Sequence, residues 1–425
     1  MATDAVTFDA AAVRRYQRTA VIAGAVGLVL CALGWLVTPD HFFRSYLWAY
    51  CFFLGIALGS LVLNMLQFQT GGVWGLVIRR ILEASTRTLP VLALLFLPIV
   101  AGFLIPARGA GEGSAGQGDP QAGTRPAISG IYIWADPAVL ETDHALEFKA
   151  RYYLNVPFFL ARAAVCFAVW LLFMYLVDRS SVALDRPDVG DTEPRHLRKI
   201  SGAGLVLYGI TVTVMAIDWI MSLEPHWVSS IFGPLVGIGQ VLNALSFTVI
   251  VLVLASDRPP LSEVVGRPIL RDLGGLMLTF VMVWAYLSFS QLLLIWSGNL
   301  PSEIPYYLRR TQGGWQVFAV ALALFHFALP FLLLLSFDVK RNRKTLLQVA
   351  AILLAMRAVD LYWLIMPAHP GEAGLGFAPF VPGWTDLVAP VAIGGIWLAA
   401  FLGQLQRRPL MPTYDPRLAE AVHHE

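Results

Sequence analysis

TVTVMAIDWIMSLEPHWVSSIF, residues 211–232, places a carboxylate inside an apolar run. Asp218 lies within the run, and Glu224 and His226 flank Pro225 at its edge. A charge in hydrocarbon costs at least about 2.5 to 3.5 kcal/mol, so an intramembrane carboxylate indicates a functional site with a partner. Because the residue before a proline is pushed out of the helical region, the helix should end near Glu224, about 9 Å beyond Asp218 at about 1.5 Å per residue. The stretch predicts a buried acid below an outer vestibule.

The composition is that of a polytopic membrane protein. Of 425 residues, 57% are apolar and only 14% are charged, and the mean hydropathy is +0.66. A net charge of +2 offers no basic surface for nucleic acid, so nucleic-acid binding is set aside. Cys31, Cys51 and Cys166 are far apart and lie in apolar runs. We therefore expect the chain itself to bind no cofactor of the iron–sulfur, structural zinc or covalent haem c type.

Ten apolar runs of spanning length predict an all-α fold with about ten transmembrane helices. The first run follows a basic tail, and its length without a small-residue cleavage site favours a retained helix over a signal peptide. Lys and Arg residues number 21 on the side of the N-terminus and 7 on the other side, which predicts that both termini are cytoplasmic. The runs are residues 18–37, 46–66, 88–105, 154–177, 201–223, 231–255, 273–297, 314–337, 345–366 and 384–405.

Three connections between the runs have distinct compositions. Residues 107–125 are rich in glycine, alanine and serine, which is typical of a flexible connector without a core. Residues 136–151 alternate acids and bases beside Trp134, which predicts an ordered outer cap or docking surface. The basic stretch 79–87 has helical spacing, which predicts a helix lying at the membrane interface.

The strongly ionisable residues inside the spans balance in charge. They are Arg162, Asp218, Arg357 and Asp360, and His326 is a deep histidine. Arg357 and Asp360 are three residues apart and face nearly the same way, so they form either a structural ion pair or part of a proton relay. Asp218 has Arg162 and Arg357 as candidate partners, and we expect it to exchange protons. One deep histidine cannot supply both ligands of an intramembrane haem b.

Uncharged and outer polar residues extend the candidate set. Asn243 and Gln291 lie at membrane depth, where such groups form interhelical hydrogen bonds or line a hydrated proton path. Glu224, His226 and Trp227 form a candidate quinone site, because a histidine at a helix end can bind a quinone carbonyl or shuttle protons. The alternative is an interfacial histidine satisfied by water.

The outer stretch SGNLPSEIPYYLRRTQGGW, residues 297–315, places Arg309 and Arg310 beside paired tyrosines. Two arginines next to aromatic rings suit docking of an acidic partner or a lipid headgroup. An interfacial aromatic belt with arginines that reach the headgroups explains the same pattern.

Several long strings resemble a known family: DWIMSLEPHWVSSIFGP, WSGNLPSEIPYYLRRTQGGW, HFALPFLLLLS, RAVDLYWLIMP, FFRSYLWAYCFFLGIALGS and RRILEASTRTLP. They closely resemble a membrane subunit of bacterial alternative complex III, a respiratory quinol:cytochrome c oxidoreductase. The chain looks like the second, ActF-like, of two related ten-helix subunits, which are similar to the NrfD and polysulfide-reductase membrane subunits. The resemblance implies two four-helix bundles, residues 46–223 and 231–366, flanked by helices at residues 18–37 and 384–405.

The resemblance also implies partners and a location. The partners are a related ten-helix sister subunit, a periplasmic iron–sulfur subunit and multihaem cytochrome c subunits, in the lipids of the bacterial inner membrane. The haem c and iron–sulfur clusters belong to those partners, and quinol oxidation belongs mainly to the sister subunit. The residues carried over as a candidate proton path are Arg162, Asp218, His326, Arg357 and Asp360.

We therefore expect a non-redox membrane subunit of a quinol-oxidising complex, with no catalytic residue of its own. It would act as a scaffold and a proton path, and quinone binding in this copy stays an open alternative. An ion- or proton-coupled secondary transporter is the rival from another class, because midplane charges suit it as well. Transporter sites usually lie on broken helices in corresponding halves, whereas the interior prolines Pro98 and Pro330 do not correspond.

Overall fold

The computed structural model describes residues 10–106, 126–185, 192–257, 261–368, 379–409 and 411. These residues are mostly helical and contain no strand, and ten of their helical segments are long and apolar enough to cross a membrane. The predicted all-α, multi-pass membrane fold is confirmed. In chain order the ten segments consist of α1 (Ala10–Val37); α2 (Pro39–Thr70); α3 (Val73–Thr86) with α4 (Leu89–Leu95) and α5 (Leu97–Leu104); α8 (Val156–Ala183); α9 (Thr192–Met215) with η2 (Ala216–Ile220) and η3 (Met221–Leu223); α10 (Phe232–Ala255); α12 (Arg267–Gly298); α14 (Gln316–Ala321) with η4 (Leu322–Ala328) and α15 (Leu329–Leu335); α17 (Arg343–Ile365); and α18 (Thr385–Leu405).

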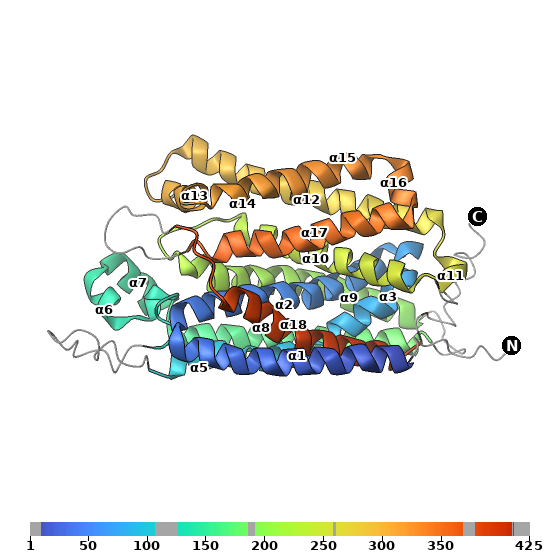
Figure 1. The fold of residues 1–425 in the computed structure, drawn as a ribbon, viewed down its shortest axis with the longest axis horizontal. Helices are drawn as coiled ribbons and strands as arrows, with labels where there is room; N and C mark the ends of the chain where they lie inside the picture. The colour runs from blue at the N-terminus through green and yellow to red at the C-terminus, as the bar shows by residue number, and fades with distance from the viewer. Residues whose placement is uncertain are drawn as a thin grey trace.

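Six short elements connect these spans. They are η1 (Ile133–Ala135), α6 (Pro137–Thr142), α7 (His144–Tyr152), α11 (Leu261–Val264), α13 (Ile304–Thr311) and α16 (Phe337–Arg341). The end of the bundle at which α6 and α7 lie is called the cap end, and the opposite end, at which α1 begins and α18 ends, is called the tail end (Figure 1). The ordered cap predicted for residues 136–151 is thus present as two short helices. The connector predicted at residues 107–125 lies outside the described residues.

The helices α2 and α10 form the centre of the bundle. They are the most buried of the ten spans, and they pack against each other. A side chain at Gly59 of α2 would place its Cβ 2.1 Å from the backbone oxygen of Gln240 in α10, so only glycine permits this approach. The polar side chains of these two helices are therefore enclosed between backbones in the middle of the molecule.

The remaining spans group around this pair. On one side α2 packs with α3 and α9, and α8 packs with α9. On the other side α10 packs with α12 and α17, and η4 packs with α17. The helix α1 runs antiparallel along α18, with Ala20 against Gly395 and Gly34 against Thr385. Large apolar side chains on the outer helices are exposed, as expected where a helix faces lipid.

The third span begins earlier than predicted. The sequence predicted an interfacial helix at residues 79–87, but α3 is buried and leads directly into α4 and α5. Arg79 and Arg80 are almost fully buried. Burial is tolerated because Arg80 is paired with Glu83, three residues along the same helix, and with Asp185 from a distant segment, and only the second pair could not be read from spacing on one helix.

Candidate functional site

The chain leaves regular α-helical geometry at Asp218. The helix α9 widens into the π-helical turn η2, which contains Asp218, and then narrows into the 3₁₀ turn η3. The hydroxyl of Ser222 donates a hydrogen bond to the backbone oxygen of Asp218. Glu224 has φ −122° and ψ 75°, outside the helical region, as predicted for the residue before Pro225. The predicted helix end near Glu224 is confirmed.

Asp218 is bound by Arg162 of α8 in a two-point ion pair. The guanidinium Nε donates to Oδ2 at 2.6 Å, and Nη2 donates to Oδ1 at 3.0 Å. The third nitrogen, Nη1, donates to the backbone oxygen of Tyr153 at 3.0 Å, and the guanidinium carbon lies 3.9 Å from the Tyr153 ring centroid. The Asp218 side chain is 1% exposed and that of Arg162 is 11% exposed. Of the two candidate partners, the structure therefore assigns Arg162 to Asp218, and the fork-to-fork geometry is typical of a firm structural pair.

A second charged pair lies on the other side of the bundle. Arg357 and Asp360 of α17 form an ion pair, and both are buried. Arg357 lies over Gly239 of α10, where an added Cβ would be 2.2 Å from Nη2. His326 of η4 is fully buried and packs edge-on against Trp284 at 4.2 Å between ring centroids, and η4 packs against α17, the helix that carries Arg357. Neither ring nitrogen of His326 has a hydrogen-bond partner among the described residues. The structure thus brings three of the predicted proton-path residues together.

Glu224 forms a separate cluster with the two arginines of α13. Arg309 Nη1 donates to Oε2 at 2.7 Å, and Arg310 Nη1 donates to Oε1 at 2.6 Å. Arg310 also donates to the backbone oxygen of Leu364 at 2.8 Å, and so ties the end of α17 to this cluster. Burial by itself lowers the pKa of Arg310, but the Glu224 carboxylate raises it, and the net pKa is above its ordinary value. Arg310 is therefore charged, and its charge is matched by Glu224.

The three residues of the predicted quinone site are engaged elsewhere. Glu224 is held by the arginines, and the Trp227 ring stacks on Tyr306 with 3.7 Å between centroids. His226 is half exposed and lies 2.8 Å from Asp143, at the N-terminus of α7 in the cap. None of the three lines any cavity described below. Quinone binding at these three residues stays a prediction, and none of the cavities described below supports it.

The uncharged polar residues occupy the centre of the bundle. Asn243 Nδ2 donates to the backbone oxygen of Phe52 at 2.9 Å, while its Oδ1 has no partner among the described residues. Gln240, one turn away, accepts from the hydroxyl of Tyr208 at 2.9 Å. On α2 the Oδ1 of Asn64 and the Nε2 of Gln67 are buried and also lack described partners. Buried polar atoms are nearly always hydrogen-bonded to protein or to ordered water, so this interior suits water molecules.

Gln291 lies apart from this central set, toward the cap end of α12. Its Oε1 accepts from the Ser229 hydroxyl at 3.1 Å, and its Nε2 lies 3.4 Å from the Tyr307 hydroxyl. Gln291 therefore links α12 to α13 and to the segment before α10, as expected for an interhelical hydrogen bond.

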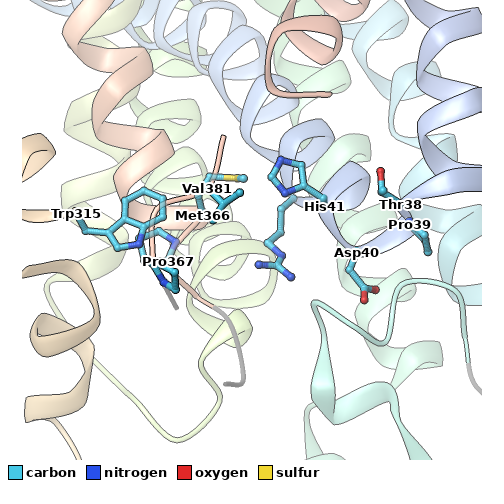
Figure 2. A pocket seen from close by; sticks show the side chains of 10 residues that line it. Thr38, Pro39, Asp40, His41, Trp315, Met366, Pro367 and Val381 are labelled. Carbon is cyan, nitrogen blue, oxygen red and sulfur yellow. The ribbon is translucent and has the colours of Figure 1, made fainter. Parts of the chain in front are cut away.

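A cavity lined by both charged and apolar residues, which the sequence did not predict, opens at the cap end, beside the start of α2. Its volume is about 420 Å³, and its lining includes His41, Arg44 and Trp315. Figure 2 shows His41 between Asp40 on one side and Met366 and Val381 on the other. His41 is held by Asp386 of α18, 3.0 Å away. The residues come from the start of α2, from Trp315 before α14 and from the segment between α17 and α18, so no local motif could have revealed this cavity.

A charged cluster at the tail end was also missed. Arg80, Glu83 and Asp185 pair there, and Arg408 Nη1 bridges Glu83 at 3.2 Å and Asp178 at 2.6 Å. Burial raises the pKa of the Asp185 carboxyl group, with Glu83 adding to the increase and Arg80 opposing it. The signal in the sequence was an acid among bases at helical spacing, which favours pairing over contact with lipid headgroups.

The fold and these clusters define a class: a multi-pass helical membrane protein with charge pairs in its interior. No group of three or more His, Cys, Asp and Glu side chains suited to a metal ion occurs among the residues that the structure describes. No protein-family model matches the chain, and no curated protein matches it.

Proposed function

We propose that the chain is a membrane subunit of a respiratory quinol:cytochrome c oxidoreductase, of the alternative complex III type, in the bacterial inner membrane. Support comes from the long strings around Asp218, His326 and Arg357 that resemble this family, and from ten helical segments long and apolar enough to cross a membrane. In this proposal the haem c and iron–sulfur clusters belong to partner subunits. The chain itself contributes a scaffold and a proton path.

One observation carries the proton path: buried polar side chains follow one another through the centre of the bundle. From the tail end, the row includes Gln67 and Asn64 of α2, and then Asn243 and Gln240 of α10. Gln240 is next to Gly239, on which the guanidinium of Arg357 rests. Polar atoms that have no partner among the described residues recur along this row, which we propose to be hydrated.

The row leads to groups that can hold or pass a proton. Neither ring nitrogen of His326 has a hydrogen-bond partner among the described residues, and Asp360 forms an ion pair with Arg357. At the cap end, Arg310 donates hydrogen bonds to the backbone at the end of α17 and to Glu224, whose other partner, Arg309, is 36% exposed. We propose that protons cross by way of the Asp360, Arg357 and His326 group, and that Glu224, which accepts a charged hydrogen bond from each of Arg309 and Arg310, holds α13 at the outer end of this path without carrying protons.

Arg162 and Asp218 have a different role in this proposal. Their ion pair is joined by two hydrogen bonds, and Arg162 makes a third to the backbone oxygen of Tyr153. The pair lies between α8 and the end of α9, where the α-helix changes to π-helical and 3₁₀ turns. A carboxylate that accepts two charged hydrogen bonds is a poor proton carrier, because protonation would break both. We propose that this pair fixes the cap end of the first bundle and that protons pass between α2 and α10 and then through the second bundle.

The test is proton movement in vesicles that contain the purified protein with its partners. Asn243→Leu and the double variant Arg357→Gln with Asp360→Asn, which leaves no unmatched buried charge, should each assemble and oxidise quinol, but should reduce the protons moved per electron. Thr279→Val is the matched control, because that hydroxyl is exposed on α12 and bonds only its own helix, to Gly275. Unchanged proton movement in both variants, at normal assembly, would refute the path.

The transporter alternative predicts a different result. Purified without partners, the chain would then carry out solute-dependent proton uptake by itself, and the same variants would reduce that uptake.

A further inference from the structure

A large cavity opens at membrane depth between α12, α13, η4 and α17. Its volume is about 540 Å³, within the about 300–1,000 Å³ that is usual for drug-sized ligands. Its walls are mainly apolar and aromatic, and Trp284, Phe327 and Trp363 contribute rings. The residues at the mouth of the cavity, Tyr286, Phe289 and Leu292 of α12, are exposed on the lipid-facing surface of the bundle. A molecule dissolved in the lipid can therefore enter it without crossing water.

One side of this cavity is polar. Gln291 and the Tyr307 hydroxyl line it, and they are within 3.4 Å of each other. Asp360 also lines it, five residues before the end of α17, which places it about 8 Å below the end of that helix at about 1.5 Å per residue. The cavity thus joins an apolar body to a hydrogen-bonding end in the half of the bundle nearest the cap.

The charges around the cavity select the kind of headgroup. No Lys or Arg is among its lining residues, so nothing there matches the phosphate of a phospholipid. The one carboxylate, Asp360, is already matched by Arg357. A ligand with a neutral polar ring is therefore favoured, because aromatic walls accept a flat ring while an amide and a phenol bond its oxygen atoms.

We propose that this cavity binds a membrane quinone, with the ring beside Gln291 and Tyr307 and the tail leaving past Phe289. The choice of a quinone over other neutral lipids rests on the proposed function. The site differs from Glu224, His226 and Trp227, which line no part of this cavity. It adjoins the Asp360 and Arg357 pair, so an occupied cavity would place a polar ring next to the proposed proton path.

The test is labelling of the detergent-purified protein, with whatever partners co-purify, by a photoreactive short-tailed azidoquinone. Label should attach to peptides within residues 282–292 or 307–323, and an excess of unlabelled quinone should suppress it while added phosphatidylglycerol should not. Ala319→Phe, which fills the cavity, should reduce labelling at least tenfold. Val320→Phe is the matched control, because Val320 is exposed on the same helix and does not line the cavity.

A milder variant separates binding from folding. Tyr307→Phe keeps the ring and removes one hydroxyl, so quinone affinity should fall about three- to tenfold at unchanged yield. Label confined to peptides that do not line the cavity, equal labelling in Ala319→Phe and Val320→Phe, or displacement by phosphatidylglycerol would overturn the proposal.

The labelling experiment can fail while the proposed function holds, and the reverse is also true. Haem and iron that co-purify with an unlabelled cavity would overturn the quinone site and leave the function intact. Specific labelling of a chain that purifies without haem or iron would overturn the function and leave the site.

Discussion

Asp218→Asn should destabilise the protein because it leaves the buried guanidinium of Arg162 without its counter-charge. The side chain of Asp218 is 1% exposed, and the pair makes two hydrogen bonds of 2.6 and 3.0 Å. Removing one partner of a buried ion pair costs about 3–5 kcal/mol. An asparagine keeps the shape and accepts one of the two hydrogen bonds, so the lower end, about 3 kcal/mol, is expected. That is a change of about 150-fold in the folded-to-unfolded ratio.

The assay is fluorescence-detected size-exclusion chromatography of detergent extracts after heating, together with the yield of assembled protein. Asp272→Asn is the matched control, because Asp272 pairs with Arg271 at 3.0 Å with both side chains more than 40% exposed. Exposed pairs contribute about 0–1 kcal/mol, so the control should behave as the native protein does. The double variant Arg162→Gln with Asp218→Asn removes the unmatched charge and should recover part of the lost stability.

Normal yield and heat resistance in Asp218→Asn would refute this reasoning. If proton movement per electron also fell in that variant, the result would restore Asp218 as the protonatable group that its place in the sequence first indicated.

Three further outcomes are expected. Gly239→Ala should displace Arg357 and destabilise the protein by about 1–3 kcal/mol, seen as a lower temperature of aggregation. Its control is Gly275→Ala, which should have no such effect because no atom lies within 4 Å of the added Cβ. Equal behaviour of the two variants would contradict the contact between Gly239 and Arg357. Glu224→Gln should leave Arg310 unmatched and lower stability by about 2–3 kcal/mol, and Glu147→Gln, at an exposed position, is its control; a heat resistance like that of the control would count against the cluster. A reporter fused after Arg408 should be active in the cytoplasm, and activity only in the periplasm would reverse the predicted topology.

Much of the fold follows from patterns within single segments. Apolar runs of spanning length predicted ten helices, and all ten are present. The proline at position 225 predicted the end of the helix at Glu224, because that constraint acts on the neighbouring residue only. The equal numbers of arginine and aspartate within the spans predicted that these residues form ion pairs. That prediction needs only the residue types and no knowledge of how the helices pack.

What the sequence could not supply depends on contacts between distant segments. Asp218 had two candidate arginines, and only the packing of α8 against α9 decides for Arg162. Glu224 lies 85 residues from Arg309, and its two-arginine cluster could not be inferred from the pattern of either segment. The burial of α3 depends on Asp185, which pairs with Arg80, and on Arg408, which pairs with Glu83, and both partners come from segments far along the chain. The cavity beside Gln291 needs the positions of four elements at once.

The most direct test of the central claim is the content of the assembly that this chain pulls from native membranes. A tagged chain, extracted in mild detergent, should bring haem c absorbance and iron in fixed ratio, together with a second ten-helix subunit. After the partners are stripped, the chain alone should carry neither haem nor iron. Isolation from native membranes as a lone oligomer without haem or iron would contradict the account and favour a transporter.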